Sequence, residues 1–144
     1  MRGRLAGRPP AAKRPLPPQA AAGRAAESFA ADWLRREKKF RLLDRNWRHG
    51  RDEIDLVARE GELLVFVEVR ARSAGALVSG VHSVNRRKKE ALRRCALAYL
   101  KGCRPQPRHF RFDIVEVQLN NQKPESLRHY ERVPVFRKHD RPTH

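Results

Sequence analysis

The sequence predicts a mixed α/β domain in the order helix, three strands, helix, strand, and three observations support this fold class. Residues 25–39 and 86–101 repeat their apolar side chains every three or four positions, which is the spacing of amphipathic helices. Residues 53–59 and 62–72 alternate polar and apolar side chains on either side of a glycine, as the strands of a β-hairpin do. Residues 110–117, rich in Phe, Ile and Val, predict the final strand.

The first predicted helix leads into a short strand. Phe29, Trp33 and Leu34 form the apolar side of the helix, and basic residues near its end lie on the outer side. A strand is expected at 40–47, where Asn46 supplies a turn signal at its end.

The hairpin that follows is the most informative part of the chain. A two-residue loop at Glu60-Gly61 would place Asp55 opposite Phe66 and Glu53 opposite Glu68. A four-residue loop about the same centre would keep the same faces, because paired residues share a side of the sheet. One face then carries Glu53, Asp55, Phe66, Glu68 and Arg70. The other face, expected to enter the core, carries Ile54, Leu56, Ala58, Leu63, Val65, Val67 and Val69.

The second predicted helix begins after Asn85, a residue suited to cap it, and ends before Gly102. Its first turn carries four cations beside free backbone N–H groups, a strong phosphate-binding arrangement: Arg86, Arg87, Lys88 and Lys89. A solvated basic face is the alternative. Cations at a helix N-terminus oppose the helix dipole, however, so stability alone does not favour them there. This favours a role in nucleic-acid binding.

The charge of the chain points to the same class of partner. Its 144 residues include 33 Lys and Arg against 16 Asp and Glu, a formal net charge of +17. Such an excess favours a polyanion, with nucleic acid first and an anionic membrane surface second. No stretch approaches the ~18–20 apolar residues of a membrane span, so we expect no membrane partner. Only two cysteines are present, which predicts a reduced, cytoplasmic setting.

The charge is divided among three segments. Residues 1–24 hold six basic residues, no acid and five of the ten prolines, which predicts a disordered tail. We expect the folded domain at 25–120 and a short C-terminal extension at 121–144.

The acids of the hairpin are the candidate chemical site. Asp55 and Glu68 lie diagonally across the predicted hairpin, with Cβ atoms expected roughly 5–8 Å apart. Glu53 adds a third negative charge to the same face. Such a cluster of oxygen ligands without His or Cys suits Mg²⁺ or Mn²⁺. The alternative is an ordinary solvent-facing hairpin whose acids are neutralised by nearby arginines.

The hairpin resembles the YraN-like family of small bacterial proteins. The resemblance rests on the run Glu53-Ile54-Asp55-Leu56 and on the run Phe66-Val67-Glu68-Val69-Arg70-Ala71-Arg72. Weaker matches, in the same order along residues 23–117, are Gly23, Glu27, Val84, Arg87-Lys88 and Arg111-Phe112-Asp113-Ile114-Val115. The resemblance implies a restriction-endonuclease-like fold, similar to that of Holliday-junction resolvases.

The resemblance also implies a chemistry, by analogy of fold. It implies hydrolysis of DNA phosphodiesters with Mg²⁺ held by Asp55, Glu68 and the backbone carbonyl of Val69. Glu27 would bind through water or orient the ion. Arg70 stands where the nuclease pattern has Lys; arginine stays protonated, so it can hold a phosphate but cannot act as a general base.

Other features stay open at this point. Asp113 is either an outer residue of the site or a strand-end carboxylate bonded to backbone. The oligomeric state is also open, although the resemblance makes a homodimer possible, since junction enzymes of this fold commonly act as dimers. Two rivals to an endonuclease are a catalytically inactive nucleic-acid-binding module and a basic accessory protein that docks on another protein.

Overall fold

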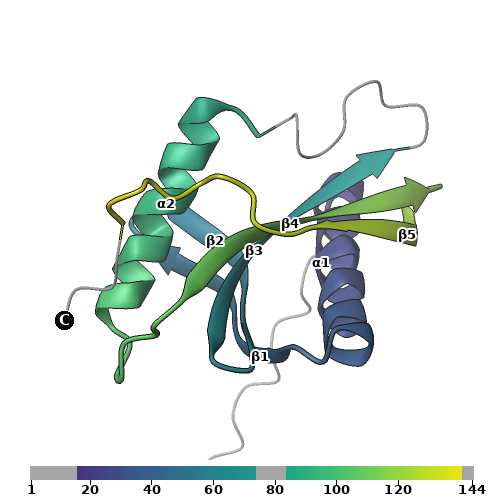
Figure 1. The fold of residues 1–144 in the computed structure, drawn as a ribbon. Helices are drawn as coiled ribbons and strands as arrows, with labels where there is room; N and C mark the ends of the chain where they lie inside the picture. The colour runs from purple at the N-terminus through teal and green to yellow at the C-terminus, as the bar shows by residue number, and fades with distance from the viewer. Residues whose placement is uncertain (1–15, 74–83, 141–144) are drawn as a thin grey trace, which may run out of the picture.

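Five strands form one mixed sheet with a helix on each face (Figure 1). The structure is a computed structural model that describes residues 16–73 and 84–140. Strand order in the sheet follows the chain; β3 and β4 are parallel, and the other neighbours are antiparallel. The elements are α1 (Pro18–Glu37), β1 (Arg41–His49), β2 (Asp52–Glu60), β3 (Leu63–Ser73), α2 (Arg86–Lys101), β4 (Phe110–Asn120) and β5 (Lys123–Tyr130). The predicted mixed α/β class is therefore confirmed, and its order agrees with the nuclease-like fold that the resemblance implies.

Each face of the sheet has its own apolar core. The α1 side buries Leu34 with Leu56, Val65 and Val67. The α2 side buries Phe66 with Ile54 and other residues of β2, β3, β4 and α2. The prediction that only one face of the hairpin enters the core is wrong. Phe66 is fully buried, and Ile54 lies on the same side as Phe66, because α2 covers the face that was expected to be open.

The hairpin register is shifted by two residues from the predicted one, because Phe66 pairs with Val57 and not with Asp55. Glu60 pairs with Leu63 and Leu56 with Val67, so the turn is Gly61-Glu62. Gly61 has φ +60°, a conformation that glycine adopts without steric cost. The glycine therefore takes the first position of the turn, where the left-handed backbone is needed.

Helix α1 begins earlier than the predicted residue 25. Pro18 falls in the first turn, where its fixed φ is suitable and its missing N–H is not needed. The alanines that follow are strong helix formers, and Ala22 is already buried against the sheet. Residues 18–24 are thus helical, contrary to the predicted tail, and residues 1–15 of that tail lie outside the described residues.

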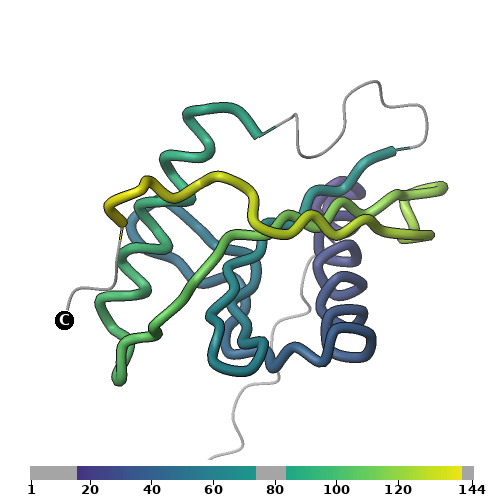
Figure 2. Tube along the Cα trace, in the orientation of Figure 1, coloured from purple at the N-terminus to yellow at the C-terminus, as the bar shows by residue number. Residues whose placement is uncertain are grey.

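The C-terminal segment, predicted as an extension, belongs to the fold. Strand β5 pairs with β4 along its length. Val133 and Val135 then pack into the core on the α2 side, and Figure 2 shows the yellow segment crossing to α2. Arg93 of α2 forms two 2.7 Å hydrogen bonds with Asp140. Alternating strand patterning in 123–130 is weak, which is why the sequence did not predict β5.

A buried polar network lies on the α1 side of β4. Asp113 is completely buried and accepts hydrogen bonds from Arg111 at 2.9 and 3.1 Å and from the Arg132 amide at 3.1 Å. Nε2 of His129 lies 2.8 Å from the same carboxylate. Burial alone would raise the pKa of Asp113, but these hydrogen bonds outweigh it and hold the pKa below its usual range.

Neither helix in the described part of the chain is both long and apolar enough to cross a membrane.

Candidate functional site

The sheet opens at one point, and the acidic residues line this opening. Strands β2 and β3 pair only as far as Leu56 and Val67. Beyond that point, β2 continues beside β1, and β3 continues beside β4. Backbone groups just past the last pair therefore face the space between two diverging strands rather than a paired strand.

Asp55 and Glu68 are the first acids beyond the last pair. One oxygen of Asp55 accepts a 2.7 Å hydrogen bond from the Val69 amide, which bridges the two strands. The amide and the carbonyl of a strand residue point to the same edge, so the Val69 carbonyl also faces this opening. Glu68 is only 4 % exposed, and its Oε2 atom is buried without a hydrogen-bond partner.

Helix α1 adds a third carboxylate to the opening. Glu27, Glu53 and Asp55 each offer an oxygen, and these oxygens lie within 4.8 Å of one another. The cluster thus combines acids from α1 and β2, with Glu68 of β3 close enough to Asp55 for their charges to interact. The structure brings together four of the five acids predicted at or near the site, and Asp113 is the exception.

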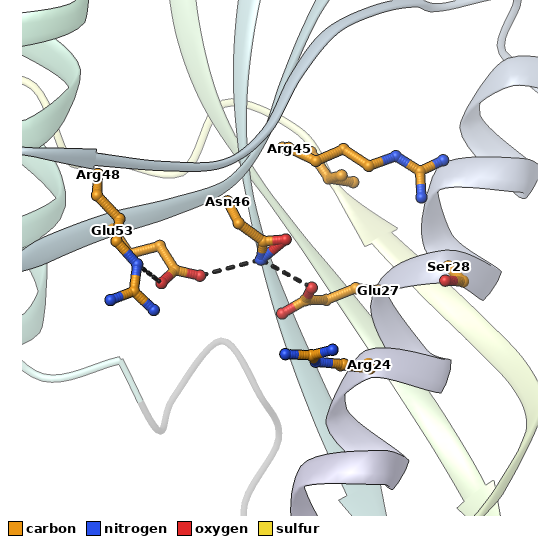
Figure 3. A pocket seen from close by; sticks show the side chains of 8 residues that line it. Arg24, Glu27, Ser28, Arg45, Asn46, Arg48 and Glu53 are labelled. Atoms are coloured by element: carbon orange, nitrogen blue, oxygen red, sulfur yellow. Dashed lines mark hydrogen bonds and ion pairs between the residues drawn. The ribbon is translucent and has the colours of Figure 1, made fainter. Parts of the chain in front are cut away.

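Asn46 organises the cluster, a role that its sequence context does not indicate. Its side-chain amide donates 3.0 Å hydrogen bonds to both Glu27 and Glu53 (Figure 3). Asn46 was predicted as a turn signal, but it lies within β1 with φ +51°. Asn tolerates this left-handed backbone better than most residues, and such strain gathers at functional sites. No pattern in the sequence predicts that Asn46 lies between two carboxylates from different elements.

Two cations contact the buried acid from different elements. Arg70 Nη1 lies 3.7 Å and Lys88 Nζ 3.5 Å from Glu68 Oε1. Lys88 is placed by the start of α2, where the Asn85 side chain accepts a 2.9 Å hydrogen bond from the Lys88 amide. The other predicted cations of this helix, Arg86, Arg87 and Lys89, lie in the same first turn, with Arg86 and Arg87 exposed.

The crowding of the acids raises their pKa values. Burial, followed by the negative charges of Asp55 and Glu53, raises the pKa of Glu27 to about 7. Burial and then the charge of Asp55 raise the pKa of Glu68 to about 8. The pKa of Asp55 is also raised by burial, although the Val69 hydrogen bond acts in the opposite direction. The charged cluster is therefore electrostatically unsatisfied by the protein alone.

These residues fit a hard divalent cation. All the donors are carboxylate or carbonyl oxygens, the ligands that Mg²⁺ and Mn²⁺ prefer. A buried carboxylate oxygen without a partner, Glu68 Oε2, is the feature that a cation would satisfy. The close approach of several negative charges also favours a bound cation, because a cation would offset their mutual repulsion.

Asp113, the remaining predicted residue, lies elsewhere. Its hydrogen bonds go to Arg111, His129 and the Arg132 amide rather than to the acidic cluster. It is within β4, not at a strand end, and it bonds two side chains as well as one backbone group. Its role is therefore in the buried network on the α1 side.

Glu68→Gln should remove most of the loss of stability with rising pH that the raised pKa of Glu68 causes. In EDTA, we expect the wild-type free energy of unfolding to fall between about pH 5 and pH 8. The native protein binds more protons than the unfolded chain in this window, because the folded pKa of Glu68 is raised from 4.5 to about 8. The variant should be more stable than wild type at pH 8.5, on the order of 2 kcal/mol.

Urea unfolding at pH 5.5, 7 and 8.5 measures this difference. Glu62→Gln, in the exposed turn of the same hairpin, is the matched control and should follow the wild-type curve. A variant curve parallel to wild type at all three pH values would contradict the raised pKa of Glu68.

Fold and site together define a class: a mixed α/β protein with an oxygen-only carboxylate cluster where two strands diverge, flanked by cations. Comparison with known proteins identifies the group within this class. Residues 26–117 match the model of the family described as Uncharacterised protein family UPF0102, and the chain belongs to this family. A UPF0102 protein of Anaeromyxobacter dehalogenans is 42% identical over 104 residues, covering 72% of this chain and 77% of its own.

Two further relatives give the same result. A UPF0102 protein of Moorella thermoacetica is 42% identical over 101 residues, covering 70% of this chain and 83% of its own. Another from Chlorobaculum parvum is 36% identical over 109 residues, covering 76% and 84%. The matched segment contains every residue of the acidic cluster and both cations that contact Glu68, so the resemblance to the YraN-like family is confirmed.

Proposed function

We propose that this protein is a metal-dependent endonuclease that hydrolyses DNA phosphodiesters with Mg²⁺ or Mn²⁺, with a preference for particular DNA structures. One observation carries the proposal. The buried Oε2 atom of Glu68, which has no hydrogen-bond partner, lies in a cluster of acids, and the basic side chains of Arg70 and Lys88 contact the other oxygen of the same residue. Without a cation, the raised pKa of Glu68 favours a proton shared with Asp55; a cation would allow both acids to carry charge, and a phosphate would neutralise the neighbouring basic side chains.

Asp55, Glu68 and the Val69 carbonyl would hold the ion, with Glu27 and Glu53 at its outer side. When bound, Mg²⁺ or Mn²⁺ supplies an activated water and positive charge for a phosphodiester under attack. Asn46 keeps Glu27 and Glu53 in place through its two hydrogen bonds.

Arg70 and Lys88 would have different roles in the site. Arg70 occupies the position where the nuclease pattern has Lys and stays protonated, so it can neutralise a phosphate but cannot accept a proton. Lys88 brings an ammonium group to Glu68 from another element. The lysine that the hairpin motif lacks is thereby supplied from α2, which supports catalysis despite Arg70.

The test is cleavage of labelled single-stranded, duplex and four-way-junction DNA by the purified full chain. We expect cleavage with Mg²⁺ or Mn²⁺ and none with EDTA, and a faster rate on one of the three substrates. Binding to all three without cleavage under any metal condition would favour an inactive nucleic-acid-binding module instead. Absence of both binding and cleavage would favour an accessory protein that docks on another protein.

Lys88→Met should lower the cleavage rate by about 10–100-fold, because it removes a positive charge that lies at the acidic centre. Lys89→Met removes the same charge one position along the helix and is the matched control. We expect Lys89→Met to weaken DNA binding slightly and to leave the single-turnover rate near wild type. Equal rates for the two variants would remove Lys88 from the catalytic centre.

A further inference from the structure

A pocket of about 460 Å³ adjoins the acidic cluster on the α1 side. It lies between α1 and the edge strand β1, and Glu27 and Glu53 form part of its wall. Three arginines from separate places also line it: Arg24 on α1 and Arg45 and Arg48 on β1. Figure 3 shows Arg24 and Arg45 on opposite sides of Glu27, while Arg48 lies beside Glu53.

The three arginines differ in how they are held. Arg48 forms a 3.0 Å ion pair with Glu53, so its charge is locally balanced. Arg24 and Arg45 act on Glu27 only through their charge, and over residues 16–73 and 84–140 neither has an ion-pair partner within 4.0 Å. Their guanidinium groups are therefore available to an external anion.

The charge balance of the pocket favours such an anion. Of the charged side chains that line the pocket, three are guanidinium groups and two are carboxylates, so the lining itself is net positive, although Asp55 adds a third carboxylate next to it. Arginine is well suited to phosphate, because its planar fork can donate two parallel hydrogen bonds to phosphate oxygens. The exposed Ser28 hydroxyl on the same wall supplies a further donor.

The pocket also completes a cationic path across the site. Arg70 and Lys88 contact Glu68 on the β3 and α2 side of the acids. Arg24 and Arg45 lie on the α1 and β1 side of the same acids. A polyanionic strand that crosses the cluster would therefore meet cations before and after it.

We propose that this pocket binds a backbone phosphate of the nucleic-acid strand that crosses the acidic cluster, with Arg24 and Arg45 as its main ligands. This inference rests on the proposed function, since it assumes that nucleic acid is the ligand. It assigns substrate binding to the edge strand β1 and to α1, in addition to the start of α2.

The test measures equilibrium binding, so that it does not depend on cleavage. Fluorescence anisotropy of a labelled oligonucleotide in EDTA, from about 50 to 200 mM salt, gives the affinity and its salt dependence. For Arg24→Gln/Arg45→Gln, we expect about tenfold weaker binding at the lowest salt. The slope of log affinity against log salt should fall by about 1, as the loss of a phosphate contact requires.

A matched double variant controls for net charge. Arg36→Gln/Arg41→Gln also removes one exposed arginine from α1 and one from β1, at positions outside the pocket. We expect this control to bind nearly as well as wild type. Equal effects of the two double variants, or no effect of either, would overturn the phosphate pocket.

The outcomes also separate this inference from the proposed function. Wild-type protein that binds but never cleaves, with the expected loss in Arg24→Gln/Arg45→Gln, supports the pocket and contradicts the nuclease. Wild-type protein that cleaves, with unchanged binding by the pocket variant, supports the nuclease and contradicts the pocket.

Discussion

Asp55→Asn should lower the rate of metal-dependent DNA cleavage by about 10²–10⁴-fold, because it removes the carboxylate at the centre of the acidic cluster. Asp55 lies within reach of Glu27 and Glu53 and interacts with the charge of Glu68, so it is the acid that links the other three. The amide oxygen of Asn can still accept the hydrogen bond from the Val69 amide. The substitution therefore changes the charge of the site more than its shape.

The stability of the variant separates chemistry from folding. The raised pKa of Asp55 means that its charge is unfavourable in the folded protein without a cation. Asp55→Asn should thus unfold at the same or a higher urea concentration than wild type while losing activity. Glu62→Gln at the turn of the same hairpin should retain full activity. Cleavage by Asp55→Asn within threefold of wild type would rule out the proposed metal site.

Binding of the metal itself is a further readout of the same variant. Mn²⁺ binding followed by calorimetry should be detectable for wild type and should be lost in Asp55→Asn. A variant that binds Mn²⁺ as wild type does would show that the ion, if it binds, is held elsewhere.

Asp113→Ala should destabilise the protein by about 3–5 kcal/mol, the range found when one partner of a buried ion pair is removed. The substitution leaves the guanidinium of Arg111 without its two hydrogen bonds from Nε and Nη2 and removes the acceptor beside His129. Trp33 and Phe40 pack edge-on against the His129 ring, so the disturbance extends to the α1 core.

The effect of Asp113 on stability should depend on pH. Folding lowers the pKa of this carboxyl, so its contribution is present above the unfolded value of about 3.8 and is lost as the pH falls through the folded value. The gap between wild type and Asp113→Asn should therefore narrow below about pH 4. Urea unfolding between pH 3 and pH 7 measures it, with Glu125→Ala on the exposed side of β5 as a control close to wild type. A gap that widens towards acid would contradict the lowered pKa.

The local elements were predictable because their signals are local. Helix α2 begins after Asn85 and ends before Gly102 as predicted, since the cap and the helix stop are encoded within a few residues. The hairpin was recognised from its alternation, but its register was not, because several turns fit the same glycine. Strand β5 was missed because its stability comes from pairing with β4 rather than from its own pattern.

The acids of the site were found in the sequence, but their environment was not. Asp55 and Glu68 stand close together along one hairpin, so their proximity follows from strand geometry. Asn46 and Lys88 reach the same acids from β1 and α2, and no spacing in the chain relates them to the hairpin. Their roles depend on how distant elements pack.

By itself, the sequence determined the mixed α/β class, the excess of positive charge and the acids of one hairpin. Only the tertiary structure decided that β2 and β3 diverge beside those acids, that α2 covers the face expected to be open and that the Oε2 atom of Glu68 is buried without a hydrogen-bond partner. The physical reason is that local periodicity records which residues prefer to be buried. Which charges meet in a shared low-dielectric site depends on the packing of elements far apart in the chain.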